Sequence, residues 1–240
     1  MASESEGTYH VCLVGDSAVS VSFEGRIISA VNTQVVQLAA AIRLTKLNGV
    51  RDVVESYSAV TVHFDPLSLD VEQLLSAVAA EADQAATPTS SGEGVASSSE
   101  RTIIVPVCYE EEFAPDLQAV AAAARCDEQE VVRRHTARTY RVYMLGFLPG
   151  FAYMASVDST IAVPRRPAPR LRVPAGSIGI AGVQTGVYPL TAPGGWQLIG
   201  RTPLIIFDLE RSDPFLFHPG DRVQFEAVAP ETFAELSATG

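Results

Sequence analysis

The second half of the chain is interrupted by proline and glycine at short intervals, and this pattern limits the fold more than any other feature. Residues 159–207 contain 7 prolines and 7 glycines, and no helical period of apolar residues appears between Pro149 and residue 230. Both residue types weaken helix interiors, whereas short strands joined by tight turns accommodate them. The pattern therefore predicts a β-barrel or β-sandwich in this half.

The first part of the chain has a different pattern, in which alternating strand-like segments flank two apolar helical periods. Asp70 is expected to be the N-cap of the second helix, and Gly49 is expected to end the first. This order favours a small α+β domain. The segments are strands at 9–15 and 18–23, a helix at 28–45, two strands within 50–65 around Ser56 and Tyr57, and a helix at 71–82.

A stretch of small and polar residues, 84–100, separates the two parts and is expected to be a flexible linker. Residues 1–100 carry 4 basic and 13 acidic side chains, whereas residues 101–240 carry 13 and 15, so the charge also changes there. We expect an α+β domain at 7–83 and a barrel or sandwich domain at 101–240. The second domain is expected to begin with a strand at 101–109, helices at 116–126 and 127–137 with Asp127 or Cys126 as the second cap, and a strand at 139–148.

The net charge of −11 and the pI near 4.8 argue against nucleic acid or an anionic membrane as the main partner. The N-terminus MASESEG lacks the features of a signal peptide, and no apolar run is long enough to span a bilayer. Three widely spaced cysteines without a CxxC pair indicate neither a disulfide framework nor a zinc site. A cytoplasmic location without a metal is the expectation.

Arginine is concentrated in the proline- and glycine-rich segment. Residues 159–207 contain no carboxylate, yet they hold five arginines, at 165, 166, 170, 172 and 201. Guanidinium groups bind carboxylate or phosphate through two parallel hydrogen bonds, so a site for a small anionic molecule is one hypothesis. The alternative is that these arginines neutralise the acidic N-terminal domain or a partner protein across an interface.

Named nucleotide and hydrolase motifs do not fit the segment AGSIGIAG. Its glycines at 176, 179 and 182 are spaced by three and no helix follows, which excludes a dinucleotide fingerprint, and no P-loop is present. Ser177 lacks the first glycine and the strand-to-helix context of a nucleophile elbow. The glycine spacing instead indicates turns or close strand contacts within a barrel.

Single histidine and tryptophan residues leave alternatives open. His135 could act as a base or orient a substrate, or it could stabilise a helix C-terminus. His10 and His63 are interpreted as sheet residues. Trp196, the only tryptophan, lies between Gly195 and Gln197 in TAPGGWQLIGRTP. It is interpreted as the floor of a pocket, as an anchor for a partner, or as a plug at one end of the barrel.

Three long segments then carry a resemblance. HTARTYRVYMLGFLPGFAYM, PRRPAPRLRVPAGSIGIAGVQTGVYPL and APGGWQLIGRTP resemble the KipI/PxpB family, also called allophanate hydrolase subunit 1 or the carboxyltransferase C/D domain. The likeness extends over most of residues 101–226, and the N-terminal GDSAVSVSF and VVESYSAVTVHFDP also resemble the family. Glu55 stands where many members have proline, and the 84–100 linker is long.

The resemblance implies a ferredoxin-like α+β domain followed by a cyclophilin-like β-barrel. It also implies a cytoplasmic subunit of an ATP-dependent 5-oxoprolinase, which opens 5-oxoproline to glutamate together with KipA/PxpC-like and PxpA-like subunits. The ATP site would be shared with those partners or lie on them. Alternatives within the family are a histidine-kinase inhibitor and half of a urea-type carboxyltransferase.

Under the first of these functions, the residues expected to form part of a shared pocket for a small anionic substrate combine aromatic rings, guanidiniums and hydrogen-bonding groups. His135 is the candidate catalytic residue. The candidate substrate-binding residues are Phe151, Tyr153, Arg165, Arg170, Gln184, Thr185, Tyr188, Trp196 and Arg201.

Overall fold

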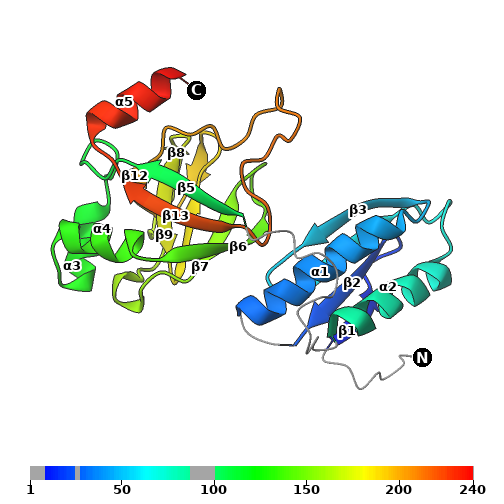
Figure 1. Ribbon diagram of the computed structural model, residues 1–240. Coiled ribbons are helices and arrows are strands. Elements are labelled where there is room, and N and C mark those ends of the chain that lie inside the picture. Colours follow the sequence, from blue (N-terminus) through cyan, green and yellow to red (C-terminus); the bar gives the residue numbers. More distant parts are fainter. Residues whose placement is uncertain (1–8, 25–27, 87–100, 240) are drawn as a thin grey trace. The chain divides into compact units, whose positions relative to one another are not determined.

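The computed structural model describes residues 9–24, 28–86 and 101–239. The chain divides into two compact units, Met1–Ser99 and Glu100–Gly240 (Figure 1). Each unit encloses a hydrophobic core of its own. We describe the two units separately.

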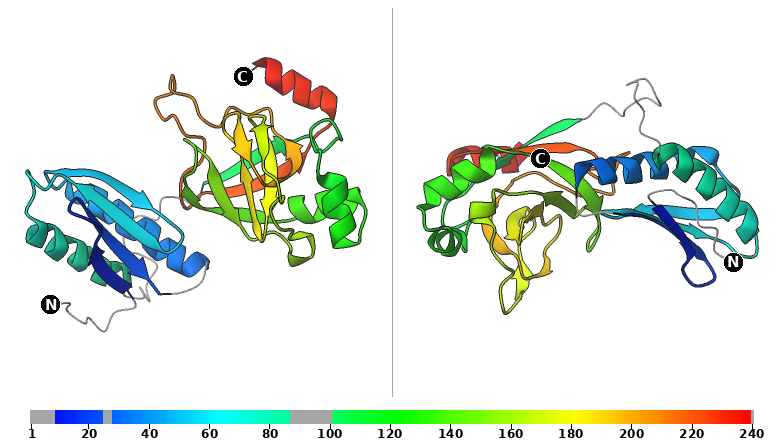
Figure 2. Two further views of the ribbon diagram at one scale, coloured as in Figure 1. Left: turned by 180° about the vertical axis from the view of Figure 1, so that it is seen from behind. Right: turned by 90° about the horizontal axis from the view of Figure 1, so that it is seen from below.

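The first unit is a four-stranded antiparallel sheet with two helices on one face (Figure 2, right). Alternate residues of the central strands, such as Val19, Val21 and Val60, are fully buried beneath Leu38 of α1 and Leu74 of α2. This alternation matches the period of two in the sequence. The elements are β1 (Tyr9–Leu13), β2 (Ala18–Phe23), α1 (Ser29–Thr45), β3 (Val50–Glu55), β4 (Ala59–Phe64) and α2 (Val71–Ala86).

The sheet order β1-β2-β4-β3 confirms the α+β prediction, with one difference in connectivity. Strands β2 and β3 are joined by α1 and lie on either side of β4, which is the split arrangement of a ferredoxin-like sheet. In the usual order an edge strand follows the second helix. Here the edge position beside β2 is taken by β1, at the start of the chain.

The helix boundaries of this unit partly differ from the expectation. Asp70 caps α2 as predicted, since its Oδ1 accepts hydrogen bonds from the backbone amides of Glu72 and Gln73. Helix α1 ends earlier than Gly49, at Lys46, which adopts a left-handed conformation with φ 48°. Gly49 is instead required by its φ of 94° and its close packing against Leu69.

The linker prediction is wrong for residues 84–86, which form the last turn of α2. Their alanines 85 and 86 pack against the core of the unit, so the helix continues as long as it can bury apolar surface. The remaining linker residues, 87–100, lie outside the described residues.

The second unit is built on a seven-stranded mixed sheet in the order β12-β9-β10-β7-β6-β13-β5, in which only the β13–β5 pair is parallel. A small ribbon, β11-β8, stands beside it. The strands are β5 (Thr102–Val107), β6 (Thr139–Leu145), β7 (Ala152–Ala155), β8 (Arg170–Val173), β9 (Ser177–Ala181), β10 (Gln184–Val187), β11 (Ala192–Gly194), β12 (Gln197–Arg201) and β13 (Arg222–Ala227).

The sheet closes into a barrel where the end of β5 meets β12. The amide of Cys108 donates to the carbonyl of Arg201 at 2.9 Å, and the amide of Arg201 donates back at 3.0 Å. A Cβ at Gly200 would lie 2.6 Å from Cγ1 of Val107, so this seam needs a glycine. The barrel prediction is confirmed, and the sequence signal for closure lies in this one position.

Helices cover little of the barrel. Helices α3 (Leu117–Ala124) and α4 (Glu128–Thr136) lie at one end, and α5 (Pro230–Thr239) follows the last strand (Figures 1 and 2). Asp127 is the N-cap of α4, because its Oδ1 accepts a hydrogen bond from the amide of Glu130 at 2.7 Å. Between Pro149 and α5, a stretch that the structure describes throughout, the only helical segment is the 3₁₀ turn η1 (Ser159–Ile161). The predicted absence of longer helices here is confirmed.

Candidate functional site

Trp196 is buried against the barrel wall, with 5% of its surface exposed. A Cβ at Gly179 of β9 would lie 2.9 Å from Cβ of Trp196, and one at Gly186 of β10 would lie 3.2 Å from Cζ3 of the indole. The ring therefore occupies space that these glycines leave open. Gly176 and Gly182 have φ values of 79° and 61° and form turns, so the predicted meaning of the glycine spacing is confirmed.

The glycines before Trp196 allow two further contacts. Gly194 lies so close to the phenol of Tyr188 that a Cβ there would overlap the ring. The carbonyl of Gly195 accepts a hydrogen bond from the backbone amide of Arg166 at 2.7 Å, and Gly194 pairs with Arg170 across the β11-β8 ribbon. The segment 194–196 thus connects the aromatic side chains to the arginines.

Four of the expected substrate-binding residues form one aromatic cluster, which we define as Phe151, Tyr153, Tyr188 and Trp196. Phe151 is its centre, and ring centroids lie 4.8 Å away for Tyr153, 5.1 Å for Tyr188 and 5.4 Å for Trp196, all edge to face. Phe151, Tyr188 and Trp196 are buried and Tyr153 is half-buried. Tyr153 is therefore the member that a ligand reaches most directly.

Phe147, which the sequence analysis did not single out, adds an exposed ring to this cluster. Its side chain is 60% exposed and lies edge to face against Phe151, at 5.5 Å between centroids. Its backbone φ is 68°, an uncommon conformation for a bulky residue. The signal in the sequence was the turn GFLPG, in which Gly150 also has a positive φ of 81°.

Positive charge lies beside the two tyrosines of the cluster. Burial raises the pKa of the phenols of Tyr153 and Tyr188, and in both cases the nearby positive charge of Arg165 lowers it in part. Arg170 acts on Tyr188 in the same direction. Arg165 is exposed. The structure therefore brings Arg165 and Arg170 together with the aromatic cluster.

The acid that balances this segment is Asp116, the residue before α3. Its Oδ1 accepts hydrogen bonds from Nη1 of Arg166 and Nη2 of Arg170, each at 2.8 Å. Its Oδ2 accepts from the backbone amide of Leu198 at 2.7 Å, and only 4% of its side chain is exposed. We call Asp116, Arg166 and Arg170 the arginine–aspartate cluster. Sequence analysis missed Asp116, because the acid lies 50 residues before the nearer arginine.

His135 and Thr185 lie inside the barrel rather than at its surface. Both are fully buried. The hydroxyl of Thr185 donates to the carbonyl of Gly179 at 3.0 Å, so it accepts from Nε2 of His135 at 3.1 Å, and Nδ1 accepts from the hydroxyl of Tyr109 at 2.8 Å. The imidazole is therefore neutral with its proton on Nε2.

Burial lowers the pKa of His135 to about 3. The ring stacks on Phe225 with 4.6 Å between centroids and shows no exposed surface. The expectation of a catalytic base at this position meets a physical obstacle, because a proton acceptor must come within hydrogen-bond reach of the substrate. The contacts of His135 are those of a residue that connects α4 to the barrel wall.

The remaining candidates lie on different elements. Nε of Arg201 donates to the carbonyl of Ala175 at 2.8 Å, next to the barrel seam, so this arginine holds a turn in place. Gln184 is half-buried at the start of β10. Arg172 of β8 is exposed. The structure therefore separates the five arginines into several environments, with Arg166 and Arg170 as the pair that shares a carboxylate.

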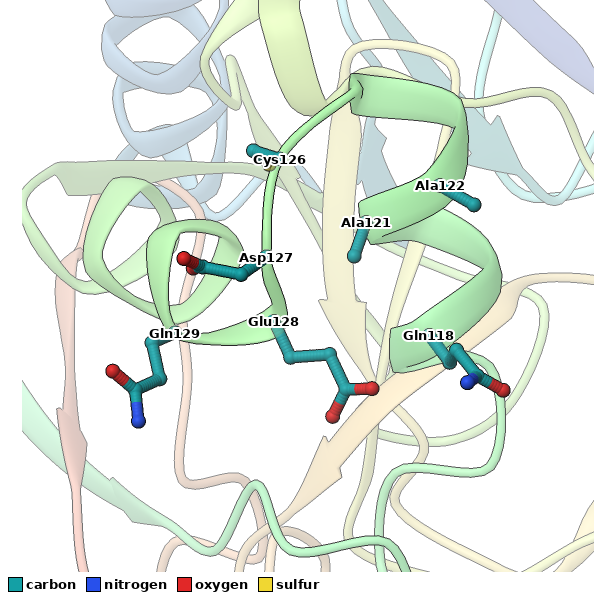
Figure 3. Close-up of a pocket in the computed structure, with 7 residues that line it drawn as sticks. All are labelled: Gln118, Ala121, Ala122, Cys126, Asp127, Glu128 and Gln129. Carbon is teal, nitrogen blue, oxygen red and sulfur yellow. The ribbon is translucent and has the colours of Figure 1, made fainter.

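A separate hollow of about 660 Å³ lies between α3 and α4 (Figure 3). The side chains of Glu128 and Gln118 extend toward it, and no arginine or lysine lines it. An acidic lining does not suit an anionic substrate. The seven lining residues are Gln118, Ala121, Ala122, Cys126, Asp127, Glu128 and Gln129.

The side chains that commonly bind metals are scattered through the structure. Within residues 9–24, 28–86 and 101–239, no three His, Cys, Asp or Glu side chains gather closely enough to hold a metal ion. The three cysteines are free thiols. No helix in the described part of the chain combines the length and the apolar character needed to cross a membrane.

Together, the fold and these contacts define an α+β protein whose second unit is a closed mixed barrel with arginine and aromatic side chains gathered around the segment 194–196. The chain belongs to the family described as "Carboxyltransferase domain, subdomain C and D", whose model matches residues 9–217.

Curated relatives match nearly the whole chain. It is 36% identical to the B-type subunit of 5-oxoprolinase from Bacillus subtilis (strain 168), over 94% of this chain and 95% of that protein. It is 40% identical to the B-type subunit of 5-oxoprolinase from Escherichia coli O157:H7, over 89% of this chain and 93% of that protein.

Solved structures agree with the fold. The crystal structure of TTHA0988 matches 88% of this chain with a TM-score of 0.77 and 34% identity, and this chain spans 40% of that longer protein. The conserved uncharacterized protein PH0987 from Pyrococcus horikoshii matches 93% of this chain and 99% of its own length, with a TM-score of 0.55 and 39% identity. Urea carboxylase from Kluyveromyces lactis, at 18% identity and a TM-score of 0.70, shares the fold.

Proposed function

We propose that this chain is the B-type subunit of a 5-oxoprolinase, which opens the lactam ring of 5-oxoproline to give glutamate. The observation that carries the proposal is the identity of 36–40% to two proteins of that name over about nine-tenths of the chain and of each relative. A third relative with this name, from Haemophilus influenzae, is 44% identical over 125 residues.

The site suits the substrate class in two respects. 5-Oxoproline has a compact, largely apolar ring that can pack on aromatic side chains, and a carboxylate that guanidiniums bind strongly. We propose that Tyr153 and Phe147 contact the ring and that Arg165 and Arg170 supply positive charge. The buried residues Phe151, Tyr188 and Trp196 would hold the exposed ones in position.

His135 and Thr185 have a different role in this proposal. Their hydrogen bonds fix β9 and β10, the strands on which Trp196 rests. Gln184 and Arg201 would likewise support the wall rather than touch the reacting atoms. No described side chain of the site with a shifted pKa is available as a general base, so we place proton transfer on a partner protein.

Lactam opening by this enzyme class is coupled to ATP, which when bound would supply a phosphoryl group to activate the lactam oxygen. The described residues do not fit a phosphate cradle. The glycine-rich turns at 146–150 and 176–182 lead into strands and not into helices. The first turns of α2, α4 and α5 carry Glu72, Glu128 and Glu231, which would repel phosphate. We therefore place ATP mainly on the partner proteins.

KipA/PxpC-like and PxpA-like subunits are the proposed partners. This chain spans 40% of TTHA0988, so the longer protein contains a further part joined to a unit of this kind. An arrangement of that type would bring a second protein to the barrel and complete a site that this chain forms only in part.

Reconstitution tests the function. The purified chain is mixed with its KipA/PxpC-like and PxpA-like neighbours, ATP and 5-oxoproline, and glutamate release is measured. We expect turnover that stops when the chain or ATP is omitted. A mixture that contains every component and releases no glutamate would overturn the proposal.

A further inference from the structure

The arginine–aspartate cluster contains more hydrogen-bond donors than acceptors. Asp116 gives its Oδ1 to both arginines and its Oδ2 to the amide of Leu198, so both oxygens of the carboxylate are engaged. The guanidiniums of Arg166 and Arg170 have no other hydrogen-bond partner among the described residues. Their Nε and Nη1 atoms, respectively, are buried without an acceptor. Two guanidiniums against one carboxylate also leave a net charge of +1.

The free atoms of Arg166 form a complete binding edge. Its Nη1 contacts Asp116, and covalent geometry places the remaining Nε and Nη2 side by side, with their N–H bonds parallel. Nε is buried, whereas Nη2 is neither bonded nor among the buried atoms without a partner, so the edge runs from the interior to the solvent. The side chain is 35% exposed.

The same edge binds carboxylates elsewhere in this chain. Nε and Nη2 of Arg133 donate to the two oxygens of Glu130, at 2.6 and 2.7 Å. Nε and Nη2 of Arg101 donate to the two oxygens of Asp221 in the same way, at 3.3 and 2.6 Å. A buried donor without an acceptor costs free energy, and a ligand carboxylate would supply the two acceptors that Arg166 lacks.

The cluster also lies beside the aromatic cluster. The backbone of Arg166 is bonded to Gly195, next to Trp196. Arg170 pairs with Gly194, against which the phenol of Tyr188 packs. A small ring with one carboxylate can therefore contact the exposed aromatic side chains while its charge meets Arg166.

We infer that the Nε–Nη2 edge of Arg166 binds the carboxylate of the substrate, and that Asp116 is a positioning residue that holds Arg166 and Arg170 in place for it. The inference rests on the proposed function for the identity of the substrate, 5-oxoproline. It adds Arg166 and Asp116 to the site, and it assigns Arg170 to the second, more distant charge.

The first experiment measures kinetics in the complete mixture of subunits with Arg166→Lys, which keeps the charge and removes the two-pronged edge. We expect KM for 5-oxoproline to rise at least tenfold while kcat changes less than threefold, because the carboxylate is bound equally before and during lactam opening. Asp116→Asn should raise KM in the same way. The matched control is Arg133→Lys, in which KM should stay within twofold of the unmodified chain.

The second experiment measures binding to the full chain through the fluorescence of Trp196. The chain is titrated with 5-oxoproline and with 2-pyrrolidinone, which has the same lactam ring without the carboxylate. We expect the unmodified chain to favour 5-oxoproline at least tenfold and Arg166→Lys to lose that preference. Inorganic phosphate is the competitor, and displacement of 5-oxoproline by phosphate at equal concentration would overturn the assignment to a carboxylate.

These results separate the inference from the proposed function. A KM within twofold of normal for Arg166→Lys, together with a lowered melting temperature, would show that the cluster is structural only. If the complete mixture has no turnover but 5-oxoproline binds in an Arg166-dependent manner, the carboxylate site stands and the enzymatic function falls. If 5-oxoproline binds to neither chain, the inference falls as well.

Discussion

At the scale of single residues, Trp196 lies where it does because its neighbours in space lack side chains. Gly179 and Gly186 leave room for the indole, and Gly194 leaves room for the phenol of Tyr188. Glycines around the tryptophan thus indicate close packing rather than a loose loop. Closely packed interiors respond strongly to a single added methyl group.

This packing predicts a difference between two adjacent glycines. Gly194→Ala should lower the free energy of unfolding by about 1–3 kcal/mol, because the new Cβ overlaps the ring of Tyr188. Gly195→Ala is the matched control, since its Cβ would lie at an ordinary 3.7 Å from Pro169. Denaturant unfolding followed by Trp196 fluorescence measures both. Equal losses in the two variants would contradict the packing described.

The buried imidazole of His135 predicts a dependence of stability on pH. Its pKa falls from 6.5 to about 3 on folding because burial disfavours the charged form. The unfolded chain therefore binds a proton that the folded chain does not. This contribution to stability is complete above pH 6.5 and is lost as the pH falls toward 3, by at most about 1.4 kcal/mol per pH unit.

The measurement is the slope of unfolding free energy between about pH 5 and 6.5, a range above the usual titration of carboxylates. His135→Gln should show a smaller slope than the unmodified chain, whatever its absolute stability. Identical slopes in the two proteins would mean that the ring is protonated or accessible in the folded state.

At the scale of elements, α4 depends on its ends. Asp127 caps the first turn, and Arg133 and Arg134 lie in the last turn, where positive charge is favourable. Burial of Val131 and His135 attaches the helix to the barrel. The helix thus positions a buried hydrogen-bonding group through local signals that the sequence already contains.

Asp127→Ala should lower stability by about 1 kcal/mol, because the amide of Glu130 loses its acceptor. Asp127→Ser keeps a side-chain oxygen at the cap and should retain most of the stability. Thermal unfolding monitored by circular dichroism compares the two. A serine variant as unstable as the alanine variant would show that charge, rather than the hydrogen bond, is responsible.

At the scale of the whole molecule, each unit encloses its own core, and Trp196 reports on the second unit alone. We propose 101–240 as an independently folding domain. Expressed by itself, this fragment should unfold in one cooperative transition seen both by tryptophan fluorescence and by circular dichroism. A fragment that shows no cooperative transition would contradict the proposal.

The sequence by itself determined the elements of both units, because the periods of apolar residues, the caps at Asp70 and Asp127 and the glycine turns act over a few neighbouring residues. It also determined that arginine gathers in one segment. Only the tertiary structure decided which acid meets those arginines, that the barrel closes through Cys108 and Arg201, and that His135 points into the core. Each of these depends on contacts between residues about 50 or more positions apart, which no local pattern of side chains specifies.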